Sequence, residues 1–154
     1  MYSRIQNQEF EKALKKYRAV VLLGPRQSGK TTLAKEVAKN FRYVSLEDPD
    51  QRRFAVQDPR GFLSHYSESL ILDEVQRAPE ILSFIQGILD DRNSKQRFVL
   101  TGSQNLLLME SISQTLAGRT RILSLLPLAH KELVAAGVAG NFNLDTALFM
   151  GGFP

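Results

Sequence analysis

The sequence predicts a three-layer α/β/α fold with a five-stranded, mainly parallel sheet. Short segments that are apolar throughout recur along the chain, as expected for strands covered on both faces. Segments with helical apolar periodicity separate them. Strands that alternate with helices form βαβ units, whose strands run parallel. No internal repeat or flexible linker interrupts the pattern, so we expect the 154 residues to form one domain.

The first half begins with a helix, because Phe10, Leu14 and Tyr17 share one helical face. The apolar run after this helix stops at Gly24-Pro25 and is typical of a central parallel strand. Pro49 and Pro59 break the polar stretch that closes this half. The expected elements are, in order, helix 7–17, strand 19–23, helix 29–40, strand 42–46 and one or two short helices between 48 and 69.

The second half repeats the alternation. Pro79 suits the first position of a helix, Gly118 ends a later helix, and Pro127 ends the last strand. The expected elements are strand 70–72, helix 79–91, strand 98–101, helix 106–116, strand 121–126 and helices 128–136 and 144–150.

Composition excludes several classes of site. The chain has no cysteine, which excludes disulfides, cysteine-ligated zinc, iron–sulfur clusters and thiol nucleophiles. No apolar run approaches the roughly 20 residues of a membrane span, and the N-terminus has no secretory signal. We therefore expect a cytoplasmic protein with no membrane contact. Residues 1–60 carry 13 Lys and Arg against 7 Asp and Glu. Without an accompanying motif, this basic balance is only weak support for nucleic-acid binding.

The strongest motif lies between the first strand and the helix after it, where residues 24–31 match G-x-x-x-x-G-K-[ST]. Such a loop holds polyphosphate with backbone N–H groups and the helix N-terminus. Lys30 is expected to reach the β- and γ-phosphates, and Thr31 to offer its hydroxyl to Mg²⁺. The predicted nucleotide-binding residues are Gly24, Pro25, Arg26, Gln27, Ser28, Gly29, Lys30, Thr31 and Thr32.

Acidic and polar side chains lie at the ends of the neighbouring strands. Asp73 ends an apolar strand and is expected to hold Mg²⁺, while the adjacent Glu74 is placed to activate water for attack on the γ-phosphate. After the next strand, Ser103 is the first candidate to sense the γ-phosphate and Asn105 the second, although both also suit a turn and helix cap. Arg119 is a candidate to offset transition-state charge in its own site or a neighbour's, and the alternative is an ordinary surface arginine.

Together these motifs resemble a large prokaryotic family of AAA+-type ATPases whose members carry a C-terminal domain of unknown function. The resemblance rests on the loop at 24–32 and on Leu72-Asp73-Glu74-Val75-Gln76, Leu100-Thr101-Gly102-Ser103, Leu116-Ala117-Gly118-Arg119, Pro127-Leu128 and Gly151-Gly152-Phe153-Pro154. It implies the additional-strand catalytic-glutamate class of P-loop proteins, with strand order 5-1-4-3-2. Lys30, Thr31, Asp73 and Glu74 match the family's nucleotide and hydrolysis positions, and Arg119 matches its Gly-Arg.

The resemblance implies an ATP- and Mg²⁺-dependent ATPase module that serves as switch or motor for a C-terminal domain or a protein partner. Because relatives continue beyond Gly-Gly-Phe-Pro, residues 1–154 are expected to be the N-terminal ATPase domain of such a protein, and its oligomeric state stays open. The sequence contains no guanine-reading Asn-Lys-x-Asp motif, so we expect adenine to be preferred over guanine.

Two other functions remain open. The first is a small-molecule phosphotransferase that uses Arg52, Arg53 and Arg60; the second is a nucleotide-binding interaction module without catalysis. His65 and His130 have no partner spacing and are expected to be structural or surface residues.

Overall fold

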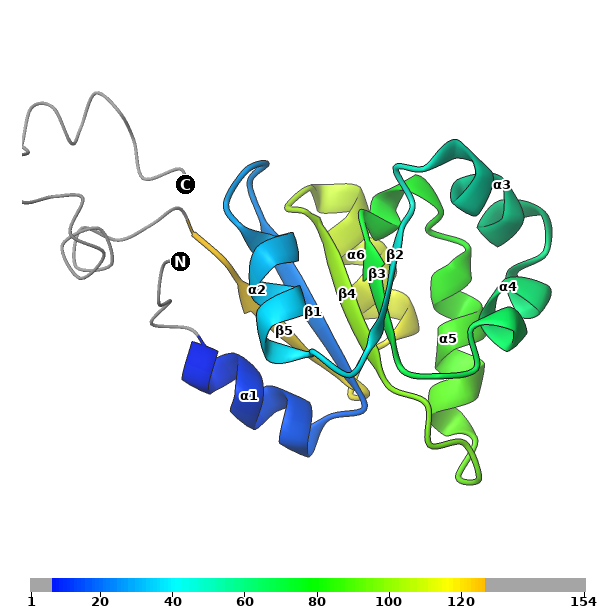
Figure 1. The fold of residues 1–154 in the computed structure, drawn as a ribbon, viewed down its shortest axis with the longest axis horizontal. Coiled ribbons are helices and arrows are strands. Elements are labelled where there is room, and N and C mark those ends of the chain that lie inside the picture. The colour runs from blue at the N-terminus through cyan, green and yellow to red at the C-terminus, as the bar shows by residue number, and fades with distance from the viewer. Residues whose placement is uncertain (1–6, 127–154) are drawn as a thin grey trace, which may run out of the picture.

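The computed structural model describes residues 7–126 and has the predicted three-layer architecture (Figure 1). The strands are β1 (Ala19–Gly24), β2 (Arg42–Ser45), β3 (Leu70–Asp73), β4 (Phe98–Ser103) and β5 (Thr120–Ser124). The α-helices are α1 (Asn7–Lys16), α2 (Lys30–Val37), α3 (Pro49–Gln57), α4 (Pro59–His65), α5 (Ile81–Asp90) and α6 (Leu106–Thr115), and a 3₁₀ turn, η1, covers Val75–Arg77.

The five strands form one sheet in the order β2-β3-β4-β1-β5, and every pair is parallel. This confirms the order 5-1-4-3-2. The central strand β1 has all six residues buried, and its Gly24 lies in register with Ser103 of β4. Because the strands are parallel, the loops after β1, β3 and β4 meet at one edge of the sheet, the upper edge in Figure 1. We call it the carboxyl edge.

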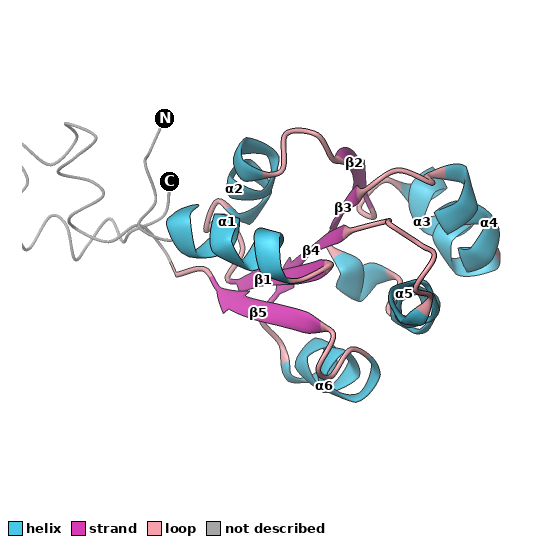
Figure 2. Cartoon of the chain, turned by 90° about the horizontal axis from the view of Figure 1, so that it is seen from below, coloured by secondary structure: helices cyan, strands magenta, loops and turns pink. Residues whose placement is uncertain are grey.

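Alternate residues of the strands enter two separate cores. On one face Val20, Leu22 and Val99 pack with residues of α1 and α2. On the other face Val21, Leu72 and Leu100 pack with residues of α3 to α6. Figure 2 shows the sheet lying between these two groups of helices. Burial on both faces explains why the strands are apolar throughout and do not alternate with polar residues.

Most element boundaries agree with the predictions, and both short helices of the polar stretch are present. Asp48 and Asp58 cap them, each accepting hydrogen bonds from backbone N–H groups of the first turn. The helix expected over 29–40 ends at Val37 instead, because the Phe41 N–H already bonds to the Ala38 carbonyl as the chain turns into β2.

The 3₁₀ turn η1 was not predicted. The expected helices 128–136 and 144–150, and His130, lie outside the described residues. Between residues 7 and 126, no helix combines the length and the apolarity needed to cross a membrane.

Candidate active site

The loop between β1 and α2 has the backbone of a phosphate cradle. Gly24 must be glycine, because a Cβ there would lie 2.2 Å from the Leu125 carbonyl oxygen. Gly29 caps α2 with φ of 85°, a left-handed conformation that glycine adopts without strain. Gln27 is also left-handed, with φ of 61°. The loop therefore turns sharply at the carboxyl edge and enters the N-terminus of α2, where free N–H groups favour an anion.

Lys30 lies inside this loop and is only 5% exposed. Its Nζ donates to the carbonyl oxygens of Gly24 at 3.1 Å and Pro25 at 2.7 Å. Burial lowers the pKa of Lys30, while the nearby carboxylates of Glu74 and Asp73 oppose that shift. The ammonium group is thus held by two loop carbonyls that a phosphate oxygen can replace as its hydrogen-bond acceptors. Thr32, in the first turn of α2, is exposed, so its side chain does not pack in the core.

Asp73 has the surroundings of a metal-binding carboxylate. The Thr31 hydroxyl lies 2.9 and 3.1 Å from its two oxygens, the Tyr43 hydroxyl donates to Oδ2 at 2.8 Å, and the Thr101 hydroxyl donates to Oδ1. Burial, and next the bond to Asp73, raise the pKa of Tyr43 to about 12, so this phenol remains a donor across the neutral range. Three hydroxyl groups therefore fix the orientation of a carboxylate that is 5% exposed.

These donors fit a magnesium ion. Mg²⁺ takes oxygen ligands and usually binds proteins through one or two side chains, completing its shell with water and substrate phosphates. Thr31 and Asp73 supply such a pair at the mouth of the cradle. Within residues 7–126 no group of three or more His, Cys, Asp or Glu residues could hold a metal ion by itself.

Glu74 comes directly after Asp73 and is held in an uncommon conformation. Its φ of 61° and ψ of 50° are left-handed, which is costly for a residue with a side chain and persists where the surroundings enforce it. Its N–H donates to the Thr101 hydroxyl at 3.3 Å, and its Oε2 accepts a hydrogen bond from Gln76 Nε2. Thr101 thus contacts both acidic residues, and Gln76 holds the Glu74 carboxylate.

Ser103 and Asn105 lie at the same edge but have different surroundings. Ser103 is beside Gly24 in the sheet register, and its Oγ is 3.5 Å from Gln76 Nε2, so it lies with the cradle and Glu74. Asn105 is the N-cap of α6, where its Oδ1 accepts a hydrogen bond from the Leu108 N–H at 2.7 Å. The cap alternative is therefore the one observed for Asn105.

Arg119 does not lie in its own chain's site, which corrects that part of the sequence prediction. It precedes β5, and β5 runs parallel to β1, so Arg119 is at the edge opposite the cradle. Its guanidinium pairs with both carboxylate oxygens of Asp90 at the end of α5, at 2.6 and 3.0 Å. This bonding to Asp90 raises the pKa of Arg119 and lowers that of Asp90. Two hypotheses remain for Arg119: a role in the site of a neighbouring chain, or that of an ordinary surface arginine paired with Asp90.

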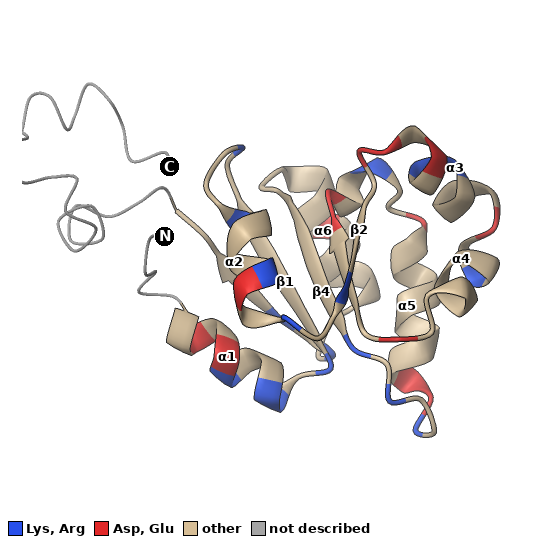
Figure 3. Cartoon of the chain, viewed as in Figure 1, with Lys and Arg blue, Asp and Glu red and all other residues tan. Residues whose placement is uncertain are grey.

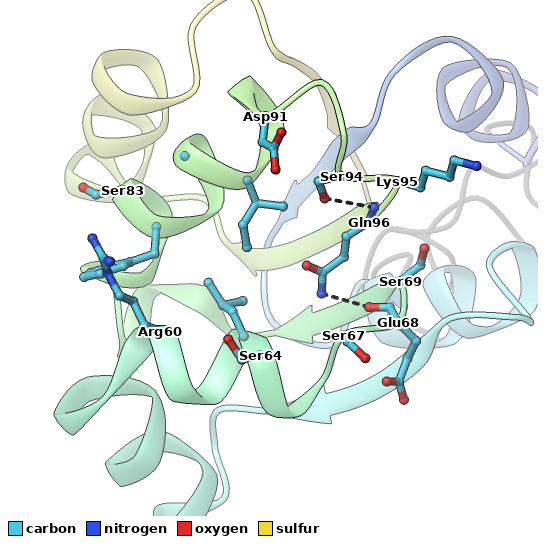
Figure 4. A pocket seen from close by; sticks show the side chains of 14 residues that line it. Arg60, Ser64, Ser67, Glu68, Ser69, Ser83, Asp91, Ser94, Lys95 and Gln96 are labelled. Atoms are coloured by element: carbon cyan, nitrogen blue, oxygen red, sulfur yellow. Dashed lines mark hydrogen bonds between the residues drawn. The ribbon is translucent and has the colours of Figure 1, made fainter.

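The three arginines of the phosphotransferase hypothesis are separated. Arg52 lines a hollow beside the loop, Arg53 lies 4.0 Å from Asp50, and Arg60 lies over the Phe84 ring. Arg60 borders a larger hollow of about 930 Å³ between α4 and α5 (Figure 4). Gln96 closes one side of it by bonding the carbonyls of Tyr66 and Glu68. This hollow lies where β3 and β4 begin, away from the cradle.

Three residues that contact the acidic pair were given no role in the sequence analysis: Tyr43, Gln76 and Thr101. Thr101 carried a usable signal, because it is a hydroxyl residue inside an apolar strand where valine has the same shape. Tyr43 and Gln76 carried none, since their contacts depend on how β2 and η1 lie relative to β3. His65 packs edge-on against Phe54 and Tyr66, as expected for a structural residue.

The chain is similar to known proteins in sequence and in fold. The sequence profile described as "AAA domain" matches residues 16–134. The chain is 33% identical over 146 residues to an uncharacterized protein of Mycobacterium bovis and to one of Mycobacterium tuberculosis. The match covers 93% of this chain and 31% of each relative, so the chain spans about a third of their length.

Two solved structures share this fold with the chain. The Walker-type ATPase PABY2304 of Pyrococcus abyssi aligns with a TM-score of 0.66 and 17% identity, over 100% of this chain and 65% of that one. The T158V variant of RuvB from Thermotoga maritima aligns with a TM-score of 0.51 and 22% identity, over 86% of this chain and 48% of that one. At these identities the likeness concerns the fold.

Proposed function

The chain belongs to the AAA domain family of P-loop ATPases, and we propose that it binds ATP with Mg²⁺ and hydrolyses the γ-phosphate as a switch or motor module. The observation that carries the proposal is the hydrogen bond of 2.9 Å between the Thr31 hydroxyl and the Asp73 carboxylate. This pair lies beside a loop that is bounded by glycines and contains the buried Lys30. Binding without turnover would need no second carboxylate beside Asp73, yet Glu74 is present and is held by Gln76 and Thr101.

In this proposal the residues have separate tasks. The backbone N–H groups of residues 26–31 bind the phosphates, and Lys30 exchanges its two carbonyl acceptors for phosphate oxygens. A magnesium ion, when bound, neutralises developing charge on the phosphates, and Thr31 and Asp73 would hold it. Glu74 takes a proton from the attacking water through its carboxylate, and Ser103 senses the γ-phosphate. Thr101 and Tyr43 are positioning residues, because they act through Asp73.

Two substitutions test the assignment. Glu74→Gln should lower ATP turnover by at least about a hundredfold while leaving affinity for Mg·ATP within a few-fold. Lys30→Ala should weaken nucleotide binding measured by calorimetry with a non-hydrolysable ATP analogue, and a GTP analogue tests the adenine preference. Unchanged turnover in Glu74→Gln would remove Glu74 from the mechanism. If nucleotide binds but neither protein hydrolyses it, a binding module without catalysis is the better description.

Arg119 is proposed to act in trans on the site of a second chain. A partly exposed arginine at the opposite edge is available to a neighbour once it leaves Asp90. Arginines supplied in this way contribute about 10³–10⁵ in rate where they have been measured. Mixing the Arg119→Ala and Lys30→Ala proteins tests this role. In a mixed pair, the Arg119→Ala chain supplies an intact cradle and the Lys30→Ala chain supplies the arginine. Recovery of turnover only on mixing supports action in trans; no recovery at any concentration rejects it.

A further inference from the structure

A second hollow, of about 500 Å³, lies beside the cradle at the carboxyl edge. Arg26 of the β1–α2 loop, Arg52 of α3, and Gln76 and Arg77 of η1 line it. Figure 3 shows basic segments on the β1–α2 loop and in α3 at this same end of the sheet. Gly29, Lys30, Thr31 and Asp73 are not among the lining residues, so the hollow lies beside the nucleotide cradle and shares only Arg26 with its loop. Three segments far apart in the sequence each bring a guanidinium group here.

These guanidinium groups have few counter-charges. Among the described residues, neither Arg26 nor Arg52 makes an ion pair, and Arg77 has only Glu47, at 3.6 Å. The neighbouring arginine, Arg53, differs because it lies 4.0 Å from Asp50 and does not line the hollow. Like charges held near one another repel, and a bound anion removes that repulsion. A guanidinium group presents a planar set of N–H donors that can bind two phosphate oxygens at once.

We propose that Arg26, Arg52 and Arg77 form a second anion site, which takes a single terminal phosphate group. The charges around the hollow favour one phosphate over an extended nucleic-acid backbone, because Glu47, Asp48 and Asp50 come soon after β2 and would repel further phosphates. Three cations suit the two negative charges of a phosphate monoester or of inorganic phosphate. The phosphate comes either from the hydrolysed nucleotide or from a second, phosphorylated molecule.

Gln76 links this site to Glu74. Its side chain lines the hollow, while its Nε2 donates to the Glu74 carboxylate. Its Oε1 is buried against Gly102 and accepts no hydrogen bond within the described part of the chain, so the present amide position leaves one polar atom unsatisfied. A phosphate in the hollow offers a competing acceptor for the amide N–H. We expect phosphate binding to compete with Glu74 for the Gln76 amide and to weaken the hydrogen bond between these two side chains, a consequence that rests on the proposed function.

Phosphate titration followed by ¹H–¹⁵N NMR tests the site without relying on turnover. Inorganic phosphate is added to the chain saturated with Mg²⁺ and a non-hydrolysable ATP analogue, and separately to nucleotide-free Lys30→Ala. The reporter is the side-chain amide signal of Gln76, assigned by its loss in Gln76→Leu. Sodium chloride at matched ionic strength is the control for screening. We expect a saturable shift in both backgrounds.

Matched variants identify the arginines. Arg52→Gln should weaken phosphate binding about tenfold, the loss expected for one charged hydrogen-bond donor. Arg53→Gln, with the same change of charge on the same helix, should leave it within twofold. No saturable shift in either background, or equal weakening by both variants, overturns the site. A shift without movement of the Gln76 amide signal overturns the link to Glu74 alone.

Further ligands identify the source and the class of phosphate. A monoester such as glycerol 2-phosphate that binds more tightly than inorganic phosphate indicates a second phosphorylated molecule, and the reverse order indicates the hydrolysis product. A single-stranded oligonucleotide that binds more tightly than both, through Arg52, would replace the single-phosphate assignment with nucleic acid. If the site binds phosphate in Lys30→Ala while the unaltered chain binds no nucleotide, the anion site survives and the proposed ATPase function fails.

Discussion

Thr101 offers the sharpest test of how the acidic pair is held, because its hydroxyl contacts both members. The side chain is fully buried, donates to Asp73 and accepts from the Glu74 N–H at 3.3 Å. Thr101→Val keeps the shape and removes the hydroxyl. The substitution removes one of the three hydroxyl donors to the Asp73 carboxylate and leaves the Glu74 N–H without its acceptor.

The expected cost can be worked out from these contacts. A hydrogen bond to a charged group contributes about 1.5–3 kcal/mol, and a long bond to a neutral N–H contributes about 0.5–1 kcal/mol. The added methyl group returns at most about 0.8 kcal/mol of hydrophobic burial. Thr101→Val should therefore lower the free energy of unfolding by about 2 kcal/mol. For a domain of this size, that corresponds to a fall in Tm of about 4–8 °C.

Urea and thermal unfolding followed by circular dichroism measure this change. Thr120→Val is the matched control: it is the same substitution at the opposite edge, where the hydroxyl reaches only the Leu116 carbonyl at 3.4 Å. The control should cost less than about 1 kcal/mol. Affinity for Mg²⁺ with nucleotide should fall in Thr101→Val alone, because the Asp73 carboxylate loses its fixed orientation. Equal costs for the two variants would refute the account of how Asp73 is held.

Other substitutions test the cradle and its surroundings. Lys30→Met should change the free energy of unfolding by less than about 1 kcal/mol, because burial already disfavours the charged ammonium group. The same variant should show no nucleotide binding in calorimetry. A large loss of stability would show that Lys30 has a structural role. Gly24→Ala should lower the free energy of unfolding by about 2–4 kcal/mol, because the new Cβ meets a backbone oxygen at 2.2 Å. Gly87→Ala, in a helix with open space around it, should raise the free energy of unfolding by about 0.5–1 kcal/mol. Urea unfolding measures both changes, and similar values for the two variants would contradict the crowding at Gly24. The pKa of Tyr43 is raised in the fold to about 12 from 10.0. The contribution of its neutral phenol to the free energy of unfolding is therefore complete below about pH 10 and is lost as the pH rises toward 12. The stability difference between the unaltered chain and Tyr43→Phe should accordingly shrink over that range in urea titrations, and a difference independent of pH would rule out the bond to Asp73.

The fold was largely predictable because each strand is a short apolar run between breakers. β1 is apolar from Ala19 to Leu23, and the G-x-x-x-x-G-K-[ST] loop after it marks the start of α2. The end of α2 was placed three residues too late, at Asn40, because the sequence does not show that the chain already turns at Ala38 so that Phe41 packs against the core. The left-handed Glu74 had no signal either, since glycine usually marks that conformation.

The candidate site was predictable where its residues are adjacent in sequence. Lys30 and Thr31 lie in one motif, and Asp73 and Glu74 end one strand. The contacts of Tyr43, Gln76 and Thr101 depend on tertiary structure, which the motif does not encode. Arg119 shows the converse, because a plausible motif position lies at the far edge once the strand direction is known.

The sheet topology also governs when the cradle can form during synthesis. Ala19 of β1 pairs with Phe98 and with Thr120, so the central strand must wait for chain made much later. At about 5–20 residues per second, β4 emerges on the order of 4–16 seconds after β1. Throughout that interval β1, the most completely apolar strand, has no neighbour on either side. A nascent chain that carries the whole G-x-x-x-x-G-K-[ST] sequence therefore cannot yet hold a nucleotide, and its exposed strand is a natural substrate for a chaperone.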